Sequence, residues 1–296
     1  MMELKEGFLP DKARLTANFN SAAKNYDEIA ELQKTVATRL LEHLDPIRIT
    51  PQLILDLGSG TGGPARALRK RFKPGNVVQL DIAPRMLLQS RKRAAKFFSG
   101  QLYVCADAEV LPFKPASFDL IYSSLVIQWT HNLDHLFRSL KLCTNAGGLL
   151  LFSSLGPDTL KELRESWAEA DEAVHVNAFV DMHDIGDALI RAGFTDPVLE
   201  TEMLTMTYSS VGELLRELKQ LGAGNVNSGR RRSLTGKFRF QRMLDAYTRR
   251  KVDDRFPASY EVIYGHAWAA AGSGESAAGP RTSVIPVSAI KRNRDG

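Results

Sequence analysis

Cysteine is scarce in this chain, with only Cys105 and Cys143 among 296 residues. Two cysteines do not suggest a disulfide framework, and such a chain suits a reducing compartment. Long apolar runs are also lacking, since no stretch approaches the roughly 18 apolar residues of a membrane-spanning helix. The opening MMELKEGFLP carries charges and no apolar run, unlike a signal peptide. We therefore expect a cytoplasmic protein without a membrane partner.

Metal ligands and activated nucleophiles at recognisable spacings are lacking too. His131 and His135 stand four residues apart but have no third ligand nearby, so we expect no metal. Cys105 falls in an apolar run and is expected to be a buried core residue rather than a nucleophile. The chain has no G-x-S-x-G motif. These absences argue against a metalloenzyme and against the common covalent hydrolases.

Positive charge is concentrated in one segment of the chain. The formal net charge is +5, and residues 211–250 hold ten Lys and Arg against three Asp and Glu. This segment can account for the whole excess. A basic patch indicates an acidic partner such as nucleic acid, anionic lipid or an acidic protein. A solvated basic helix face would give the same composition.

Strand and helix patterns alternate regularly from residue 52 to 154. Short apolar runs predict strands at 52–57, 76–81, 101–107, 118–122 and 149–154, with helices at 63–73, from Pro84 onward and at 132–145. This alternation is typical of parallel βαβ units in a doubly wound sheet. Right-handed crossovers would place helices on both faces. A ligand would then bind outside the carboxyl ends of the strands.

The segments on either side complete the expected architecture. An apolar stripe predicts one helix over 11–44. Further patterns predict helices at 158–170, 181–192, 211–221 and 237–250 and strands at 197–207 and 258–267. We expect an α/β fold with a Rossmann-like, seven-stranded, mostly parallel, doubly wound sheet and a helical cap. A single domain would span 1–268, made of an N-terminal helical segment (1–45), a cofactor-binding core (46–155), cap helices with strand six (156–250) and the last strand (251–268), before a flexible tail (269–296).

A glycine-rich turn follows the first predicted strand. Gly58, Gly60 and Gly62 allow a tight turn and a close approach of a ligand to the backbone at a helix N-terminus. The same run fits the G-x-G-x-x-G pattern of nicotinamide dinucleotide sites. Asp56, however, stands two residues before the first glycine, where it would repel a pyrophosphate. This acid and the G-x-G-x-G spacing favour a methyltransferase cofactor site.

Two further acids follow the next two predicted strands. Asp81, with Ile82 beside it, is placed to accept hydrogen bonds from both ribose hydroxyls, although a solvated loop aspartate is an alternative. Asp107 can accept the adenine amino group while the Ala108 N–H meets a ring nitrogen. An acid at this third strand end is common in methyltransferases and less so in dehydrogenases. Acids at three successive strand ends thus predict S-adenosyl-L-methionine as cofactor.

The loop after the fourth strand is expected to face the methionine end of that cofactor. It contains Ser124, Gln128 and Trp129. Trp129 and Tyr26 can stack near a sulfonium, a cation–π contact of about 0.5–2 kcal/mol. Plain packing, of Trp129 against the following helix and of Tyr26 in the core stripe, explains them equally well.

At these residues the sequence resembles the malonyl-acyl-carrier-protein O-methyltransferase family of biotin synthesis. The matching segments are 19–27, 56–62, 107–129, 151–167, 175–194 and 257–268, which cover nearly the whole chain to residue 268. All class I methyltransferases share the glycine motif. The Phe19–Asp27 opening, the Gln128-Trp129 pair, the GPDTL stretch (156–160) and the YGHAW stretch (264–268) are much more specific.

The resemblance implies transfer of a methyl group to the free carboxyl of malonyl-acyl carrier protein, giving the methyl ester that primes pimeloyl synthesis. A malonyl carboxylate is already ionised at pH 7, so no general base is needed. We expect Tyr26, Gln128 and Trp129 to orient it, with a cation nearby for which Lys219 and Arg216 are candidates. Acyl carrier proteins are acidic, so Arg230, Arg231 and Arg232 are expected to bind one. Nucleic acid is disfavoured because the basic segment has few interleaved aromatics.

Three alternatives stay open. The glycine turn and the acids also suit a methyltransferase that acts on another small molecule. A related group of respiratory-complex assembly factors, some of which modify a protein side chain, resembles the middle and C-terminal regions. A nicotinamide-dependent dehydrogenase is disfavoured by Asp56 and Asp107. The sequence carries no signal for an oligomeric state.

Overall fold

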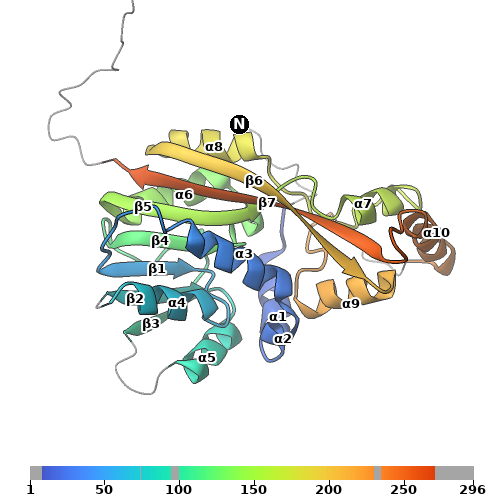
Figure 1. Ribbon diagram of the computed structural model, residues 1–296, viewed down its shortest axis with the longest axis horizontal. Helices are drawn as coiled ribbons and strands as arrows, with labels where there is room; N and C mark the ends of the chain where they lie inside the picture. The colour runs from blue at the N-terminus through green and yellow to red at the C-terminus, as the bar shows by residue number, and fades with distance from the viewer. Residues whose placement is uncertain (1–8, 74, 95–99, 230–234, 271–296) are drawn as a thin grey trace, which may run out of the picture.

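One seven-stranded sheet organises the molecule in the computed structural model, which describes residues 9–73, 75–94, 100–229 and 235–270. The strands lie in the order β3-β2-β1-β4-β5-β7-β6 (Figure 1). They are β1 (Leu53–Leu57), β2 (Asn76–Asp81), β3 (Gln101–Cys105), β4 (Phe118–Ser124), β5 (Thr144–Leu155), β6 (Phe194–Tyr208) and β7 (Phe256–Ala269). Neighbours among β1–β5 pair in parallel, and β7 is antiparallel to both β5 and β6. The predicted mostly parallel, doubly wound sheet is confirmed.

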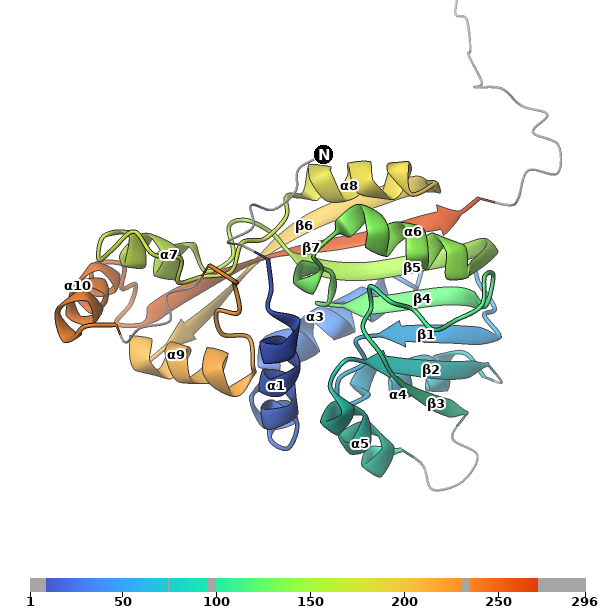
Figure 2. The same cartoon turned by 180° about the vertical axis from the view of Figure 1, so that it is seen from behind.

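Helices cover both faces of the sheet, as the alternating pattern predicted. On one face, α3 (Glu31–Glu42) and α4 (Gly63–Arg71) bury Val36 and Leu68 against strand residues such as Tyr122. On the other, α6 (Leu133–Cys143) and α8 (Met182–Arg191) pack Phe137 and Leu189 into a second cluster (Figure 2). Because the central strands are buried on both sides, they read as continuous apolar runs. The helix α5 (Pro84–Arg93) packs beside β2 and β3.

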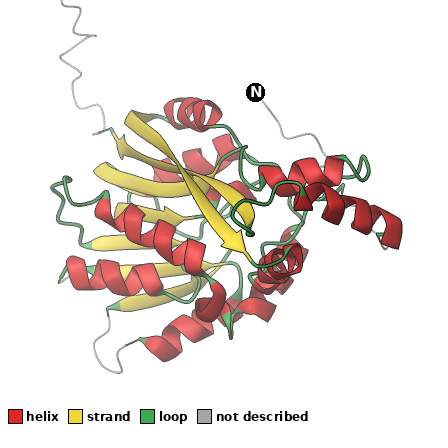
Figure 3. Ribbon diagram, turned by 45° about the vertical axis from the view of Figure 1, so that its right-hand side comes forward, coloured by secondary structure: helices red, strands yellow, loops and turns green. Residues whose placement is uncertain are grey.

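Three later helices project beyond the carboxyl ends of the parallel strands. These are α7 (Lys161–Ala168), α9 (Val211–Gln220) and α10 (Lys237–Thr248), and they lie around the far ends of β6 and β7 (Figures 1 and 3). Leu214 and Met243 extend the buried cluster of the α3–α4 face into this cap. The Tyr247 hydroxyl donates to the Pro257 carbonyl at 2.7 Å, which ties α10 to the start of β7. The cap thus continues the core.

The predicted single helix over 11–44 is wrong, because the chain forms three helices there. They are α1 (Lys12–Ala22), α2 (Tyr26–Ile29) and α3, with non-helical backbone at Asn25 and at Ala30 (φ −83°, ψ 51°). Asp27 explains the interruption. Its carboxylate accepts the Thr61 hydroxyl and pairs with Arg93 at 3.0 Å, so α2 is held on the glycine turn. These tertiary contacts override an unbroken helical pattern that contains no glycine or proline.

Two smaller expectations also change. Cys105 is exposed rather than buried, because β3 is an edge strand of the sheet. Partial desolvation of the sulfur and then the charge of Asp81 nevertheless raise the Cys105 pKa, so it is not an activated thiolate. Of the predicted tail, residues 271–296 lie outside the described part of the chain. Within the described ranges, no helix has the length and apolarity to cross a membrane.

Candidate active site

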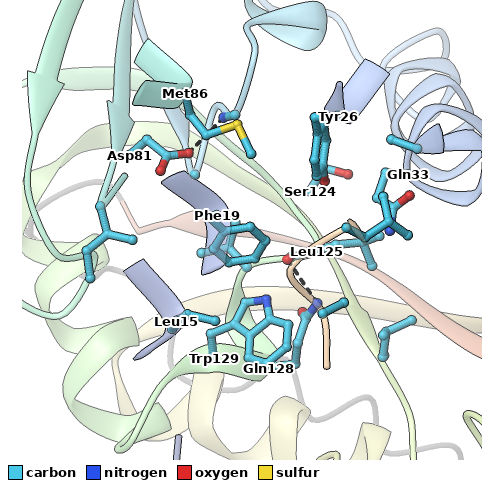
Figure 4. Close-up of a pocket in the computed structure, with 18 of the residues that line it drawn as sticks. Leu15, Phe19, Tyr26, Gln33, Asp81, Met86, Ser124, Leu125, Gln128 and Trp129 are labelled. Carbon is cyan, nitrogen blue, oxygen red and sulfur yellow. Dashed lines mark hydrogen bonds between the residues drawn. The ribbon is translucent and has the colours of Figure 1, made fainter. Parts of the chain in front are cut away.

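A pocket of about 370 Å³ lies at the carboxyl ends of the parallel strands, within the size range of small-molecule sites. One side, here called the strand-end wall, is lined by residues of 56–66, 80–86, 106–109 and 124–130. The opposite side, here called the cap wall, is lined by residues of 155–179 and 217–225 together with Tyr260. Side chains from α1, α2 and α3, among them Phe19, Tyr26 and Gln33, also line the pocket (Figure 4).

The glycine turn requires the absence of side chains. Gly58, Gly60 and Gly62 have φ values of +68°, +54° and +78°, which disfavour residues with a Cβ. A Cβ on Gly58 would stand 2.1 Å from Val126 Cγ2, and one on Gly62 would stand 1.9 Å from Ser90 Oγ. Gly58 and Gly60 line the pocket, whereas Gly62 packs the turn onto α5 from behind. A Cβ on Gly60 would meet nothing within 4 Å, so open space lies in front of that residue.

Two buried carboxyl groups flank this turn. Asp81 accepts the backbone N–H of Gly60 through Oδ2 and that of Ala83 through Oδ1, each at 2.8 Å. Its burial raises its pKa to about 6 against the opposing effect of those two donors. Asp56 is more extreme, since burial and then the charge of Asp81 raise its pKa to about 8. Within the described chain, Asp56 Oδ2 is buried without a hydrogen-bond partner.

Asp107 and Ala108 line the pocket beyond Asp81 and Ile82, as predicted from the strand ends. The structure adds a group that the sequence did not reveal: Lys12 Nζ lies 2.8 Å from both Asp107 Oδ1 and Glu109 Oε2. Burial disfavours ionised Glu109, but hydrogen bonds from Lys12 and Thr130 outweigh it and lower the Glu109 pKa to about 2. This ion-pair cluster fastens α1 across the strand ends.

The loop after β4 brings the remaining predicted residues together. Ser124, Gln128 and Trp129 line the pocket, and so does Tyr26 from α2 (Figure 4). Gln128 Nε2 donates to the Leu125 carbonyl at 2.9 Å, which leaves Oε1 buried and without a partner in the described chain. Trp129 meets Phe19 edge to face, with ring centroids 6.0 Å apart. Burial, then the charges of Asp81 and Asp27, raises the pKa of Tyr26, so its hydroxyl stays protonated at neutral pH.

A helical cap was predicted from the sequence, but not the polar residues by which it lines the pocket. His175, Asn177 and Glu217 contribute polar groups to the cap wall, from a loop and from α9. Asn177 Oδ1 accepts the Val226 N–H at 3.2 Å, and Glu217 Oε1 accepts the Tyr208 hydroxyl at 2.8 Å. Burial raises the pKa of Glu217. No local motif marks these residues, because they converge only through the packing of separate segments.

The predicted cations do not enter the pocket. Lys219 is exposed on α9 and does not line it, and Arg216 is exposed too, with its Nε donating to the Gly212 carbonyl at 3.2 Å. Arg230, Arg231 and Arg232 lie outside the described residues. Across the described ranges, no group of three or more His, Cys, Asp and Glu side chains is placed to hold a metal ion.

The strand-end wall fits the S-adenosylmethionine that the resemblance implies. Three buried acceptors that line it have no partner within the described residues: Asp56 Oδ2, Ser59 Oγ and Gln128 Oε1. The cofactor offers an ammonium, two ribose hydroxyls and an adenine amine as donors. Side-chain-free Gly58 and Gly60 leave the backbone open to a ligand. The donor and acceptor chemistry of this wall therefore matches the cofactor.

Comparison with known proteins agrees with this geometry. A family model described as "Methyltransferase domain" matches residues 55–152. The YcgJ protein of Bacillus subtilis and a putative methyltransferase of Bacillus halodurans share the fold at 12% and 18% identity, with TM-scores of 0.58 and 0.55. They cover 81% and 80% of this chain and 100% and 99% of their own.

Relatives with much higher identity extend over most of the chain. A malonyl-acyl-carrier-protein O-methyltransferase of Laribacter hongkongensis is 46% identical over 90% of this chain and 92% of its own length. An enzyme of the same name from Halorhodospira halophila is 42% identical over 96% of this chain and 97% of its own length. Identity at this level across both walls of the pocket shows that the chain belongs to the malonyl-acyl-carrier-protein O-methyltransferase family.

Proposed function

We propose that this protein transfers the methyl group of S-adenosyl-L-methionine to the free carboxyl of malonyl-acyl carrier protein, giving the malonyl methyl ester that primes pimeloyl synthesis for biotin. The observation that carries the proposal is the 46% identity with a relative of that activity over 90% of the chain. That match includes the cap wall as well as the glycine turn shared by all methyltransferases of this fold. It favours this acceptor over another small metabolite and over the assembly-factor alternative.

The strand-end wall would hold the cofactor, which supplies an electrophilic methyl group when bound. Asp81, oriented by the Gly60 and Ala83 N–H groups, would accept the ribose hydroxyls. Asp107, held by Lys12, would accept the adenine amine beside the Ala108 N–H. Asp56 Oδ2 and Gln128 Oε1 supply buried acceptors for the cationic end of the cofactor. Asp56 Oδ2 and Gln128 Oε1 would thus gain the partners that they lack in the described chain.

The malonyl carboxyl needs no general base from this protein to become a nucleophile. A small carboxylic acid has a pKa near 4, so a malonyl group is ionised at pH 7. Catalysis is then chiefly alignment, which can contribute up to about 7–11 kcal/mol in favourable cases. The protonated Tyr26 hydroxyl can donate to a carboxylate, and Gln128 and Trp129 line the same pocket. We propose these three residues as the orienting groups.

Carrier docking would use the basic segment around α10. Lys237, Arg239 and Arg242 lie on that helix, and Phe238 between them is 89% exposed. An exposed aromatic ring among cations suits an acidic protein with an apolar contact. We include Arg230, Arg231 and Arg232 in this surface on the basis of sequence alone. The two free cysteines fit a reducing compartment, which supports a cytoplasmic location.

The decisive experiment offers labelled S-adenosylmethionine with malonyl-acyl carrier protein and, as control, acetyl-acyl carrier protein. Label on the malonyl carrier alone is the expected result, because the acetyl group has no free carboxyl. No label on either, with cofactor still bound, would refute the proposed acceptor. Changing Arg230, Arg231 and Arg232 to Glu should raise the KM for the carrier substrate but hardly that for malonyl-coenzyme A. Equal effects on both substrates would contradict carrier docking.

A further inference from the structure

The cap wall contains a histidine that none of the roles above uses. His175 lines the pocket, and its Nε2 lies 2.7 Å from Asp171 Oδ1. The two side chains are only 12% and 11% exposed. The imidazole also stacks flat on Trp167, with ring centroids 3.7 Å apart and planes at 6°. Two independent contacts therefore fix both the position and the plane of this ring.

The backbone around His175 is equally well held. Asp171 Oδ1 also accepts the Ala173 N–H at 3.0 Å. Asn225 donates to the Val174 carbonyl at 2.6 Å, and Asn227 donates to the Val176 carbonyl at 3.3 Å. The loop that carries His175 is thus fastened to the segment after α9. Such a constrained ring is suited to recognise a ligand rather than to fill space.

His175 differs in its position from the three Lys and Arg side chains that line the described pocket. Lys12 is committed to Asp107 and Glu109 at the adenine end. Arg66, on α4, donates to the Thr61 carbonyl in the glycine turn. Lys34 is half exposed and pairs loosely with Glu31 at 3.7 Å. Of these four groups, His175 alone belongs to the wall opposite the cofactor acids.

One nitrogen of the ring remains available for a ligand. With Nε2 facing Asp171, Nδ1 makes no hydrogen bond to any described residue. When both ring nitrogens carry a proton, Nδ1–H is a charge-assisted donor to a carboxylate. The charged groups around this pair are Asp171, Arg239 near Asp171, and Glu217 farther along the wall. Glu217 is held by Tyr208, so it does not compete for the imidazole.

We propose that His175, positioned by Asp171 and Trp167, is a specificity residue that donates one hydrogen bond to the acceptor's free carboxylate. The inference rests on the proposed function and names a side chain that could hydrogen-bond the acceptor carboxylate. One donor is preferable to a bidentate arginine, because the carboxylate loses its charge during transfer and a stronger clamp would stabilise the ground state. Methylation removes the anionic partner, so the same contact favours release of the ester.

The test compares steady-state constants and ligand binding in full-length variants. His175→Leu removes the donor, His175→Gln places an amide nearer to Nε2, and His175→Asn places one nearer to Nδ1. We expect KM for malonyl-acyl carrier protein to rise about tenfold or more in His175→Leu and His175→Gln, and less in His175→Asn. The kcat and the affinity for S-adenosylmethionine should change less than threefold. His183→Leu, at an exposed position on α8, is the matched control.

A second measurement separates recognition of the carboxylate from a general structural effect of the substitution. With S-adenosylhomocysteine bound, the wild type should bind malonyl-acyl carrier protein more tightly than its methyl ester, and His175→Leu should lose that preference. Asp171→Asn, which keeps the stacked ring but weakens its anchor, should lose part of it. Equal weakening for both ligands, or an unchanged KM, would overturn the role of His175. A wild type that fails to methylate malonyl-acyl carrier protein would instead overturn the proposed function.

Discussion

The two walls of the pocket are built from different kinds of sequence. The strand-end wall uses residues that directly follow β1, β2, β3 and β4, so each functional position stands at a fixed place in a repeated pattern. The cap wall draws on a loop at 171–179, on α9 and on the segment after it, and these meet only through packing. The strand-end wall can therefore be predicted from the sequence, and it is general to the fold. The other is assembled by tertiary contacts, and we infer that it selects the acceptor.

Replacement of Asp81 by alanine should have the largest effect, and this effect should concern only the affinity for S-adenosylmethionine, which the strand-end wall would bind. It removes the proposed acceptor for two hydroxyls and the carboxylate that Gly60 and Ala83 contact. We expect the Kd for S-adenosylmethionine to rise about a hundredfold, as two lost charge-assisted bonds would give. Calorimetry measures it, with Asp187→Ala, at an exposed site on α8, as control. Unchanged affinity would remove Asp81 from the site.

Two glycines of the turn allow the cost of a positive φ to be measured separately from the cost of a steric clash. Gly58→Ala places a Cβ 2.1 Å from Val126 Cγ2 at a positive φ, whereas Gly60→Ala has positive φ but open space. We expect the free energy of unfolding to fall by about 2 kcal/mol for the former and about 1 kcal/mol for the latter. Denaturant titration checks both values. Val126→Ala should recover part of the loss in Gly58→Ala only, and equal losses without recovery would contradict the collision.

Asp56 should make the ligand-free protein less stable as the pH rises. Its pKa is about 8 in the folded chain, raised by burial and by Asp81, against about 4 in the unfolded chain. Folding therefore opposes its ionisation, and the penalty grows between pH 4 and pH 8. Asp56→Asn should match the wild type in stability near pH 4 and exceed it by several kcal/mol at pH 8, because each pKa unit between the folded and unfolded states is worth about 1.4 kcal/mol.

Asp119 is the matched control of opposite sign. Burial raises its pKa, but hydrogen bonds from Asn145, Leu53 and Gln52 outweigh this and lower it. Its ionised form therefore stabilises the fold above pH 4, and the contribution is lost as the pH falls through its depressed pKa. Asp119→Asn should be less stable than the wild type at neutral pH. If the free energies of unfolding of Asp56→Asn and Asp119→Asn changed with pH in the same way between pH 4 and pH 8, the assignment of Asp56 would be refuted.

Lys12 joins the N-terminal helices to the strand-end wall and should give the smallest effect. Lys12→Met removes its ion pairs with Asp107 and Glu109, which are partly exposed and so worth about 0.5–1 kcal/mol. We expect the Kd for S-adenosylmethionine to rise about threefold. Lys34→Met, which also faces the pocket but lacks such a cluster, should leave the Kd unchanged. A similar rise in both variants would show a loss of general charge rather than of this cluster.

The sequence predicted the fold well because the parallel strands are buried on both faces and flanked by helices. Every strand and helix pattern between 52 and 154 found its element, and β2 was predicted with its observed limits. The break of the first helix was missed, because nothing local marks it and the Asp27 contacts decide it. The exposure of Cys105 was missed for a related reason, since an apolar run does not reveal whether its strand lies at the edge of the sheet.

By itself, the sequence determined the glycine turn, the three acids and the loop around Gln128-Trp129, since backbone conformation and strand ends fix these within short stretches. Only the tertiary structure brought Lys12 to Asp107, and His175 to the wall facing the cofactor acids. Those contacts join residues 95 positions apart or segments with no shared period. Their positions follow from how the cap packs on the sheet, and that packing is a property of the whole chain.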